Sequence, residues 1–182
     1  MKIVRGTSLR DVAFVVCTAL GKDGTEAVLT GGSAATVYAP RAYQSRDIDF
    51  IVTFSSTEAA PGAVLTALGY RDAGGHYEHP HNDLIVEFPQ GPLAVGGKLI
   101  QEWDTLHDGD MLLHIITPTD SVRDRLAGFL FWNDRGSLDQ AVAVATEMRA
   151  DVDVDAIRRW CRSEGRADEF KEFSRQLSHE LP

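Results

Sequence analysis

Two carboxylates close together in the first third of the chain could bind a metal ion. Asp47 and Asp49 are separated by one residue in the run RDIDFIVTF, whose β-branched and aromatic residues predict a strand. Because side chains alternate between the two faces of a strand, both carboxylates point to one face. Neighbouring carboxylates repel each other unless a cation lies between them, and Mg²⁺ or Mn²⁺ takes such oxygen ligands together with phosphate oxygens. The pattern therefore predicts that Asp47 and Asp49 bind Mg²⁺ or Mn²⁺ next to a phosphate.

A turn that suits phosphate lies upstream of these aspartates. Gly31, Gly32 and Ser33 follow the apolar run EAVL and precede a short helical pattern. Glycines let backbone N–H groups approach an anion closely, a helix N-terminus adds partial positive charge, and the Ser33 hydroxyl is a further donor. We therefore expect this turn to bind phosphates that the metal bridges. The alternative is a structural turn beside a strand with two solvated aspartates.

These two motifs carry a resemblance to a known family. The stretch GGSAATVYAPRAYQSRDIDFIV resembles nucleotidyltransferases of the DNA polymerase β superfamily, whose signature is a Gly-Gly/Ser turn followed by a D-x-D strand. It is similar in particular to the AbiEii/MenT-like group, many of which are toxins of toxin–antitoxin pairs. The resemblance is specific over about residues 26–53, and the layout extends it to about residue 145. It implies an α+β fold, with a nucleotidyltransferase-like mixed β-sheet flanked by helices and followed by a C-terminal helical bundle.

The resemblance also implies a third carboxylate on a neighbouring strand, for which HNDLIVEFP offers Asp83 and Glu87. These two residues share one face of the strand but lie roughly 13 Å apart along it, so only one can reach the metal. Glu87 is flanked by apolar residues as Asp49 is, which favours Glu87. The family more often uses aspartate here, so Asp83 stays open as the alternative.

A basic residue on the first helix after the sheet is a further implication of the resemblance. Arg125 stands where the family has a lysine, and a guanidinium can bind phosphate with two parallel hydrogen bonds. The alternative for Arg125 is an exposed helix residue. Asp134, Arg135 and Asp139 match the motif on the following helix only loosely.

The pattern of elements changes near residue 117. Strand and helix signals alternate before it, including a hairpin turn at Asp108-Gly109 and a helix over 57–68. After it the signals are helical, beginning with Thr117 as a cap and Pro118 at the first helical position. We therefore expect a catalytic domain over residues 1–116 and a helical C-terminal subdomain over residues 117–182.

Composition limits the function classes. The net charge of −9 and a pI near 5.0 argue against a protein coated in positive charge for nucleic acid. No apolar run approaches the length of a membrane span. The N-terminal segment reads as a helix rather than a signal peptide, which predicts a cytoplasmic protein without a membrane partner.

The sequence thus predicts a metal-dependent nucleotidyltransferase that transfers NMP from an NTP to a hydroxyl of an RNA or tRNA end or of a protein. If the chain is a toxin, an antitoxin protein is the expected partner. One alternative is a catalytically inactive module of the same fold that binds a nucleotide or a partner protein. Another is an aminoglycoside-type nucleotidyltransferase with a small-molecule acceptor.

Overall fold

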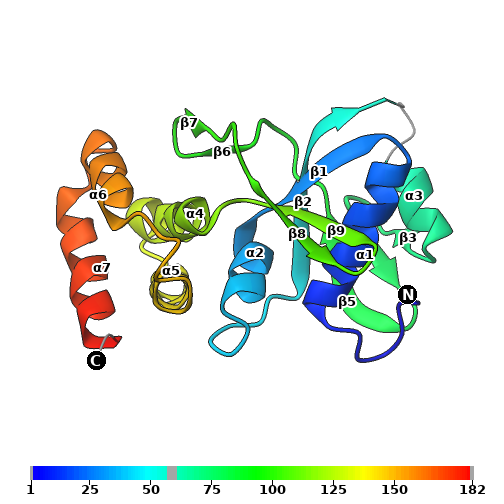
Figure 1. Ribbon diagram of the computed structural model, residues 1–182, viewed down its shortest axis with the longest axis horizontal. Helices are drawn as coiled ribbons and strands as arrows, with labels where there is room; N and C mark the ends of the chain where they lie inside the picture. Colours follow the sequence, from blue (N-terminus) through cyan, green and yellow to red (C-terminus); the bar gives the residue numbers. More distant parts are fainter. Residues whose placement is uncertain (1, 57–60, 181–182) are drawn as a thin grey trace.

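The computed structural model describes residues 2–56 and 61–180, which form a mixed α+β fold with C-terminal helices (Figure 1). This confirms the predicted fold class. The described helices are α1 (Leu9–Lys22), α2 (Gly31–Tyr38), α3 (Gly62–Ala67), α4 (Pro118–Trp132), α5 (Arg135–Glu147), α6 (Val154–Ser163) and α7 (Ala167–Glu180). The described strands are β1 (Thr25–Leu29), β2 (Asp47–Ser55), β3 (Arg71–Asp72), β4 (His76–His79), β5 (Asn82–Glu87), β6 (Ala94–Val95), β7 (Lys98–Leu99), β8 (Asp104–Asp108) and β9 (Met111–Ile115).

Seven of the described strands form one sheet in the order β3-β4-β5-β2-β1-β9-β8, and β6 and β7 form a separate hairpin. Strand β1 runs antiparallel to β2 and parallel to β9, and β2 runs parallel to β5. Helix α1 packs on β1 and β9 (Figure 1). Ile48 and Phe50 of β2 are fully buried in the core, so the alternate residues of β2 face the opposite side of the sheet.

Local sequence signals explain several element boundaries. Ser8 caps α1, and its hydroxyl accepts a hydrogen bond from the backbone N–H of Asp11 at 3.2 Å. The predicted hairpin joins β8 to β9, with Asp108 paired to Met111 around Gly109 in a left-handed conformation. The helix expected over 57–68 is found as α3, and residues 57–60 of that prediction lie outside the described residues.

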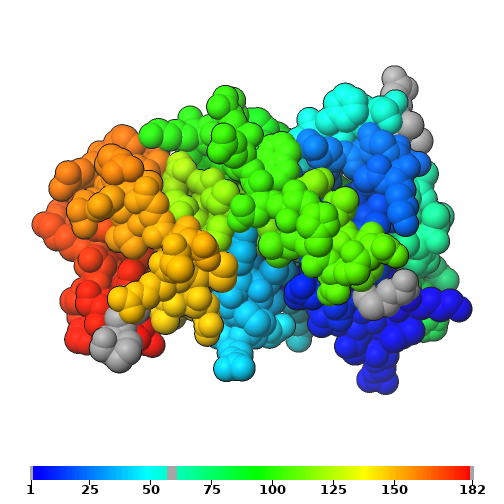
Figure 2. Space-filling model, viewed as in Figure 1, coloured from blue at the N-terminus to red at the C-terminus, as the bar shows by residue number. Residues whose placement is uncertain are grey.

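The C-terminal helices begin where the sequence predicted. The Thr117 hydroxyl accepts from the backbone N–H of Asp120 at 3.1 Å, and Pro118 occupies the first turn of α4. Helices α4 and α5 both contact α2, while α6 and α7 lie at the far end of the molecule (Figure 1). The segment with β6 and β7 reaches from the sheet to the C-terminal helices (Figure 2). At its turn, a Cβ on Gly96 would lie 3.1 Å from Oε1 of Glu164 and 3.5 Å from Cζ2 of Trp160. The sheet-containing part and the C-terminal helices thus contact each other in two places, through α2 and through the segment with β6 and β7.

Candidate functional site

The turn between β1 and α2 has the geometry of an anion site. Thr30 is the N-terminal cap of α2, and its side chain makes no capping hydrogen bond. The backbone N–H groups of Gly31, Gly32 and Ser33 occupy the first three helical positions, which have no intrahelical partner. Gly31 has a φ of +66°, and a Cβ there would lie 2.6 Å from Oδ2 of Asp49. Glycine is therefore needed at residue 31 both for its conformation and for the close approach of the carboxylate.

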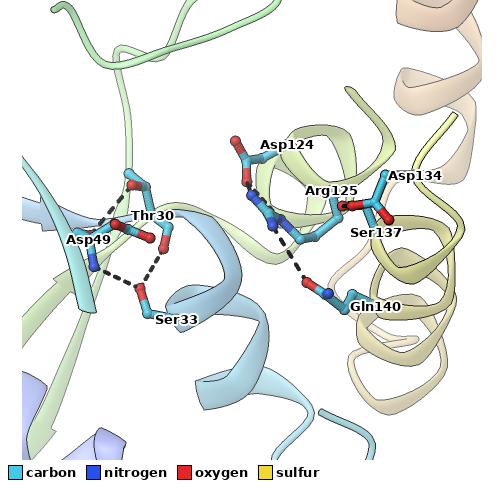
Figure 3. A network of polar contacts seen from close by, with 8 residues as sticks. All are labelled: Thr30, Ser33, Asp49, Asp124, Arg125, Asp134, Ser137 and Gln140. Atoms are coloured by element: carbon cyan, nitrogen blue, oxygen red, sulfur yellow. Dashed lines mark hydrogen bonds and ion pairs between the residues drawn. The ribbon is translucent and has the colours of Figure 1, made fainter. Parts of the chain in front are cut away.

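The hydroxyl of Ser33 holds the turn to the neighbouring strand. Ser33 is fully buried, and its Oγ donates to the carbonyl oxygen of Thr30 at 2.6 Å and accepts from the backbone N–H of Asp49 at 3.2 Å (Figure 3). The backbone N–H of Thr30 also donates to the carbonyl oxygen of Asp49 at 2.9 Å. The Ser33 hydroxyl, expected as a phosphate donor, thus has its proton engaged inside the protein. Its backbone N–H is the group left to face an anion.

Strand pairing brings Glu87 next to the D-x-D pair. In the parallel ladder between β2 and β5, Asp49 is paired with Glu87 and Asp47 with Ile85, so these residues share one face of the sheet. Asp83 is exposed and lies two residues before the paired segment, at the far end of β5 from Glu87. Of the two candidates for the third carboxylate, Glu87 is therefore the one beside Asp49.

The carboxylate of Asp49 sits in an unfavourable electrostatic environment. Its pKa is raised from 3.8 to about 6, mainly because burial penalises its charged form, and further because Glu87 and Asp47 are negatively charged. Arg125 lowers the pKa of Asp49 and Asp124 raises it. None of the described residues donates a hydrogen bond to either Asp49 carboxylate oxygen. A positively charged ligand at this face would relieve that cost.

The donor chemistry of Asp47, Asp49 and Glu87 fits a hard divalent cation, since all three supply carboxylate oxygens. The arrangement of their side chains, however, does not by itself form a metal site. Among the described residues, no group of three or more histidine, cysteine, aspartate or glutamate side chains is close enough together to hold a metal ion. Asp47 is exposed and Asp49 is half-buried, so the two carboxylates of the D-x-D pair differ in their access to solvent.

Arg125 faces this site from the helical part of the molecule (Figure 3). Its Nε and Nη2 donate to Oδ2 of Asp124 at 2.9 and 2.6 Å, and its Nη1 donates to Oε1 of Gln140 at 3.5 Å. Its charge acts on the pKa of both Asp49 and Asp134. Arg125 therefore belongs to the site, held in place by Asp124 and Gln140.

The looser motif residues have separate places. Asp134 caps α5, accepting from Ser137 Oγ at 2.6 Å, and this hydrogen bond is the main cause of its lowered pKa. Arg135 forms an ion pair with Glu172 at 3.4 Å, on a side chain that is 61% exposed. Asp139 lines a cavity between α5 and α7. Asp134 therefore stabilises the start of α5, whereas Asp139 lines a cavity.

A cavity of about 320 Å³ lies directly at the D-x-D face. Its polar wall is formed by Thr30, Gly31, Asp49 and Asp124, and the segment leading through β6 to β7 covers it with apolar side chains. Sequence reasoning missed Asp124 in this wall. Its only signal was adjacency to Arg125, because the fold brings α4 against α2 from about ninety residues away.

Compared with protein-family models, with curated proteins and with solved structures, the chain gives no match. Within the described residues, no helix has both the length and the apolar character needed to cross a membrane.

Proposed function

We propose that the chain is a metal-dependent nucleotidyltransferase that transfers NMP from an NTP to a hydroxyl acceptor. The observation that carries this proposal is the parallel register that pairs Asp49 with Glu87, with the free N–H groups of α2 beside them. A desolvated carboxylate such as Asp49 next to an anion-binding helix terminus is typical of functional sites. A structural turn with solvated aspartates would not require an Asp49 with a pKa near 6.

Different residues would bind the phosphates of the NTP and activate the acceptor hydroxyl. The backbone N–H groups of Gly31, Gly32 and Ser33 would donate to the β- and γ-phosphate oxygens. Arg125 would orient the phosphates by hydrogen bonds from its guanidinium group. Glu87 would accept the proton of the acceptor hydroxyl.

In the transfer step, the acceptor oxygen attacks the α-phosphorus in line, the bond to the β-phosphate oxygen breaks, and pyrophosphate leaves. Asp47, Asp49 and Glu87 would hold Mg²⁺ or Mn²⁺, which would neutralise charge on the entering and leaving oxygens. The raised pKa of Asp49 fits this role, because a bound cation restores its charged form.

The acceptor we propose is an RNA or tRNA end or a protein hydroxyl, as the resemblance implies. A role as a toxin with an antitoxin protein as partner, and a cytoplasmic location, are parts of the same proposal. The acidic net charge of −9 means that an RNA acceptor would have to meet a local basic surface.

Label transfer tests the activity. The purified protein is incubated with each α-³²P-labelled NTP, Mg²⁺ or Mn²⁺, and total cellular RNA, and RNA and protein are then separated. We expect label on one acceptor class with the wild type, none with Asp49→Ala, and full activity with the matched control Asp83→Ala. Equal labelling by Asp49→Ala would refute the assignment of the site.

One observation favours a second candidate, an inactive module that binds a nucleotide without transferring it. This observation is that the described carboxylates do not gather into a metal-ready group. Such a module would bind NTPs in the same assay buffer but give no label on RNA, protein or an added amino sugar. Transfer to the amino sugar alone would instead identify a small-molecule nucleotidyltransferase.

A further inference from the structure

A row of three polar side chains crosses the D-x-D face of the sheet. Asp49 of β2 is paired with Glu87 of β5, and Glu87 is in turn paired with His76 of β4. Residues that are paired directly across strands place their side chains on the same face, about 5 Å apart from one strand to the next. His76 therefore stands beside Glu87, on the side away from Asp49.

The row has a fixed direction relative to the phosphate turn. Thr30 and Gly31 directly follow β1 and line the cavity of about 320 Å³ at Asp49. Strand β1 pairs with β2 on the edge opposite to β5. In nucleotidyl transfer the attacking and leaving oxygens lie roughly in line through the phosphorus. With pyrophosphate leaving toward the phosphate turn, the attacking hydroxyl arrives from the β5 side, where Glu87 and His76 lie.

The ring of His76 is oriented by a neighbouring carboxylate. Its Nε2 lies 3.1 Å from Oε1 of Glu78, two residues further along β4. A carboxylate only accepts hydrogen bonds, so Nε2 is the donor of this pair, and in the neutral ring Nδ1 accepts. No residue in the described part of the chain donates a hydrogen bond to this Nδ1 or to the carboxylate of Glu87. The β5 side of the row thus offers two neighbouring groups that can accept hydrogen bonds from a ligand.

This part of the face is accessible to a large ligand. The side chain of His76 is 31% exposed and that of Glu78 is 63% exposed. Arg71 of the edge strand β3 is paired with Glu78, so it lies on the same face, and it is also exposed. Within residues 2–56 and 61–180, Arg71 has no ion-pair partner. Its guanidinium can therefore bind a phosphate group of a ligand that extends over β4 and β3.

We infer that this face binds the 3′-terminal ribose of an RNA, with Glu87 accepting from the hydroxyl that attacks and His76 from the hydroxyl beside it. This inference rests on the proposed function, whose acceptor it specifies. A ribose at the end of an RNA carries two neighbouring hydroxyls, which match the two neighbouring hydrogen-bond acceptors. A serine, threonine or tyrosine side chain offers only one. The phosphate on the 5′ side of the ribose would lie toward Arg71.

The two hydroxyls have different fates in the transfer step. The attacking oxygen forms the new bond to the α-phosphorus, its proton passes to Glu87, and pyrophosphate leaves with the electrons of the broken bond. The second hydroxyl keeps its proton in a hydrogen bond to Nδ1 of His76. This hydrogen bond fixes the rotation of the ribose and so aims the attacking oxygen at the phosphorus.

The sugar at the RNA end tests the inference. The RNA that the wild type labels in the transfer assay is synthesised with a 3′-terminal ribose, 2′-deoxyribose or 3′-deoxyribose. We expect kcat/KM on the ribose end to exceed that on the better deoxy end by about 10-fold, as the loss of one hydrogen bond implies. Equal use of the ribose end and a deoxy end, or label on protein or amino sugar alone, would overturn the inference and leave the proposed function standing. Label on no acceptor would overturn both.

Variants of His76 locate the recognition. His76→Ala should lower kcat/KM on the ribose end by about 10-fold and leave the value on the better deoxy end almost unchanged, because the hydroxyl that it contacts is already missing there. His76→Asn, whose amide oxygen can replace Nδ1, should keep the preference for ribose. Both variants should bind the α,β-methylene analogue of the NTP as the wild type does, since the phosphate turn is intact.

His107 provides a matched control, because it is exposed on β8 at the other edge of the sheet. His107→Ala should show the ribose preference of the wild type. An unchanged ribose preference in His76→Ala, or an equal loss on ribose and deoxy ends, would overturn the assignment of His76.

Discussion

The carboxylate of Asp49 should destabilise the folded protein at neutral pH, and removing its charge should reverse this effect. The pKa of Asp49 in the fold is about 6, against an ordinary value of 3.8. At about 1.36 kcal/mol for each unit of pKa this difference corresponds to about 3 kcal/mol. Because the side chain is only partly buried, solvent screening reduces the figure to about 2 kcal/mol.

The sign follows from proton binding. Between about pH 4 and pH 6 the folded state holds a proton on Asp49 that the unfolded state has lost. The free energy of unfolding therefore falls as pH rises through this window and stays lower above it. Asp49→Asn cannot ionise, so it should be about 2 kcal/mol more stable than the wild type near pH 8 and about equal near pH 4.

Urea unfolding of the wild type and the variant at several pH values measures this difference. Asp83→Asn, on an exposed carboxylate of β5, controls for loss of charge alone and should show no such pH dependence. Added Mg²⁺ should raise the stability of the wild type more than that of Asp49→Asn. If the two proteins lose stability equally between pH 4 and pH 8, Asp49 is not desolvated and our account of the site is wrong.

Two further predictions concern the phosphate turn. Gly31→Ala should destabilise the fold by more than about 1 kcal/mol, because alanine is strained at a φ of +66° and its Cβ would meet the Asp49 carboxylate; urea unfolding beside Gly97→Ala, at a glycine with open space around it and no left-handed φ, checks this, and equal stability of the two variants would contradict it. Ser33→Ala should cost about 1–3 kcal/mol of stability, because it leaves the backbone N–H of Asp49 and the carbonyl of Thr30 without their partner. A Ser33→Ala variant as stable as the wild type would show that its hydroxyl does not hold the turn.

Much of the fold follows from local signals in the sequence. The cap at Ser8, the turn at Gly109 and the Thr117-Pro118 start of α4 each depend on neighbouring residues, so each boundary could be predicted. The alternation of residues along β2 likewise set Asp47 and Asp49 on one face, opposite the buried Ile48.

The parts of the site that depend on distant contacts could not be predicted in the same way. The choice of Glu87 over Asp83 rested on flanking residues, whereas the strand register that decides it is a property of the whole sheet. Asp124 reaches the cavity only because α4 packs against α2. The burial of Ser33, which turns an expected ligand into a structural residue, also depends on packing that no local pattern encodes.

The electrostatics of the site argue that it is maintained for binding rather than for stability. Asp49 is partly desolvated beside Glu87, and Arg125, whose charge lowers the pKa of Asp49, makes its hydrogen bonds to Asp124 and Gln140 instead. Replacing Asp49 by a neutral residue would remove the repulsion at no cost in described hydrogen bonds of its side chain. A chain selected for stability alone would accumulate that change easily. Cation binding removes this repulsion. The affinity of the folded protein for the metal, and for the phosphate that the metal bridges, is therefore increased.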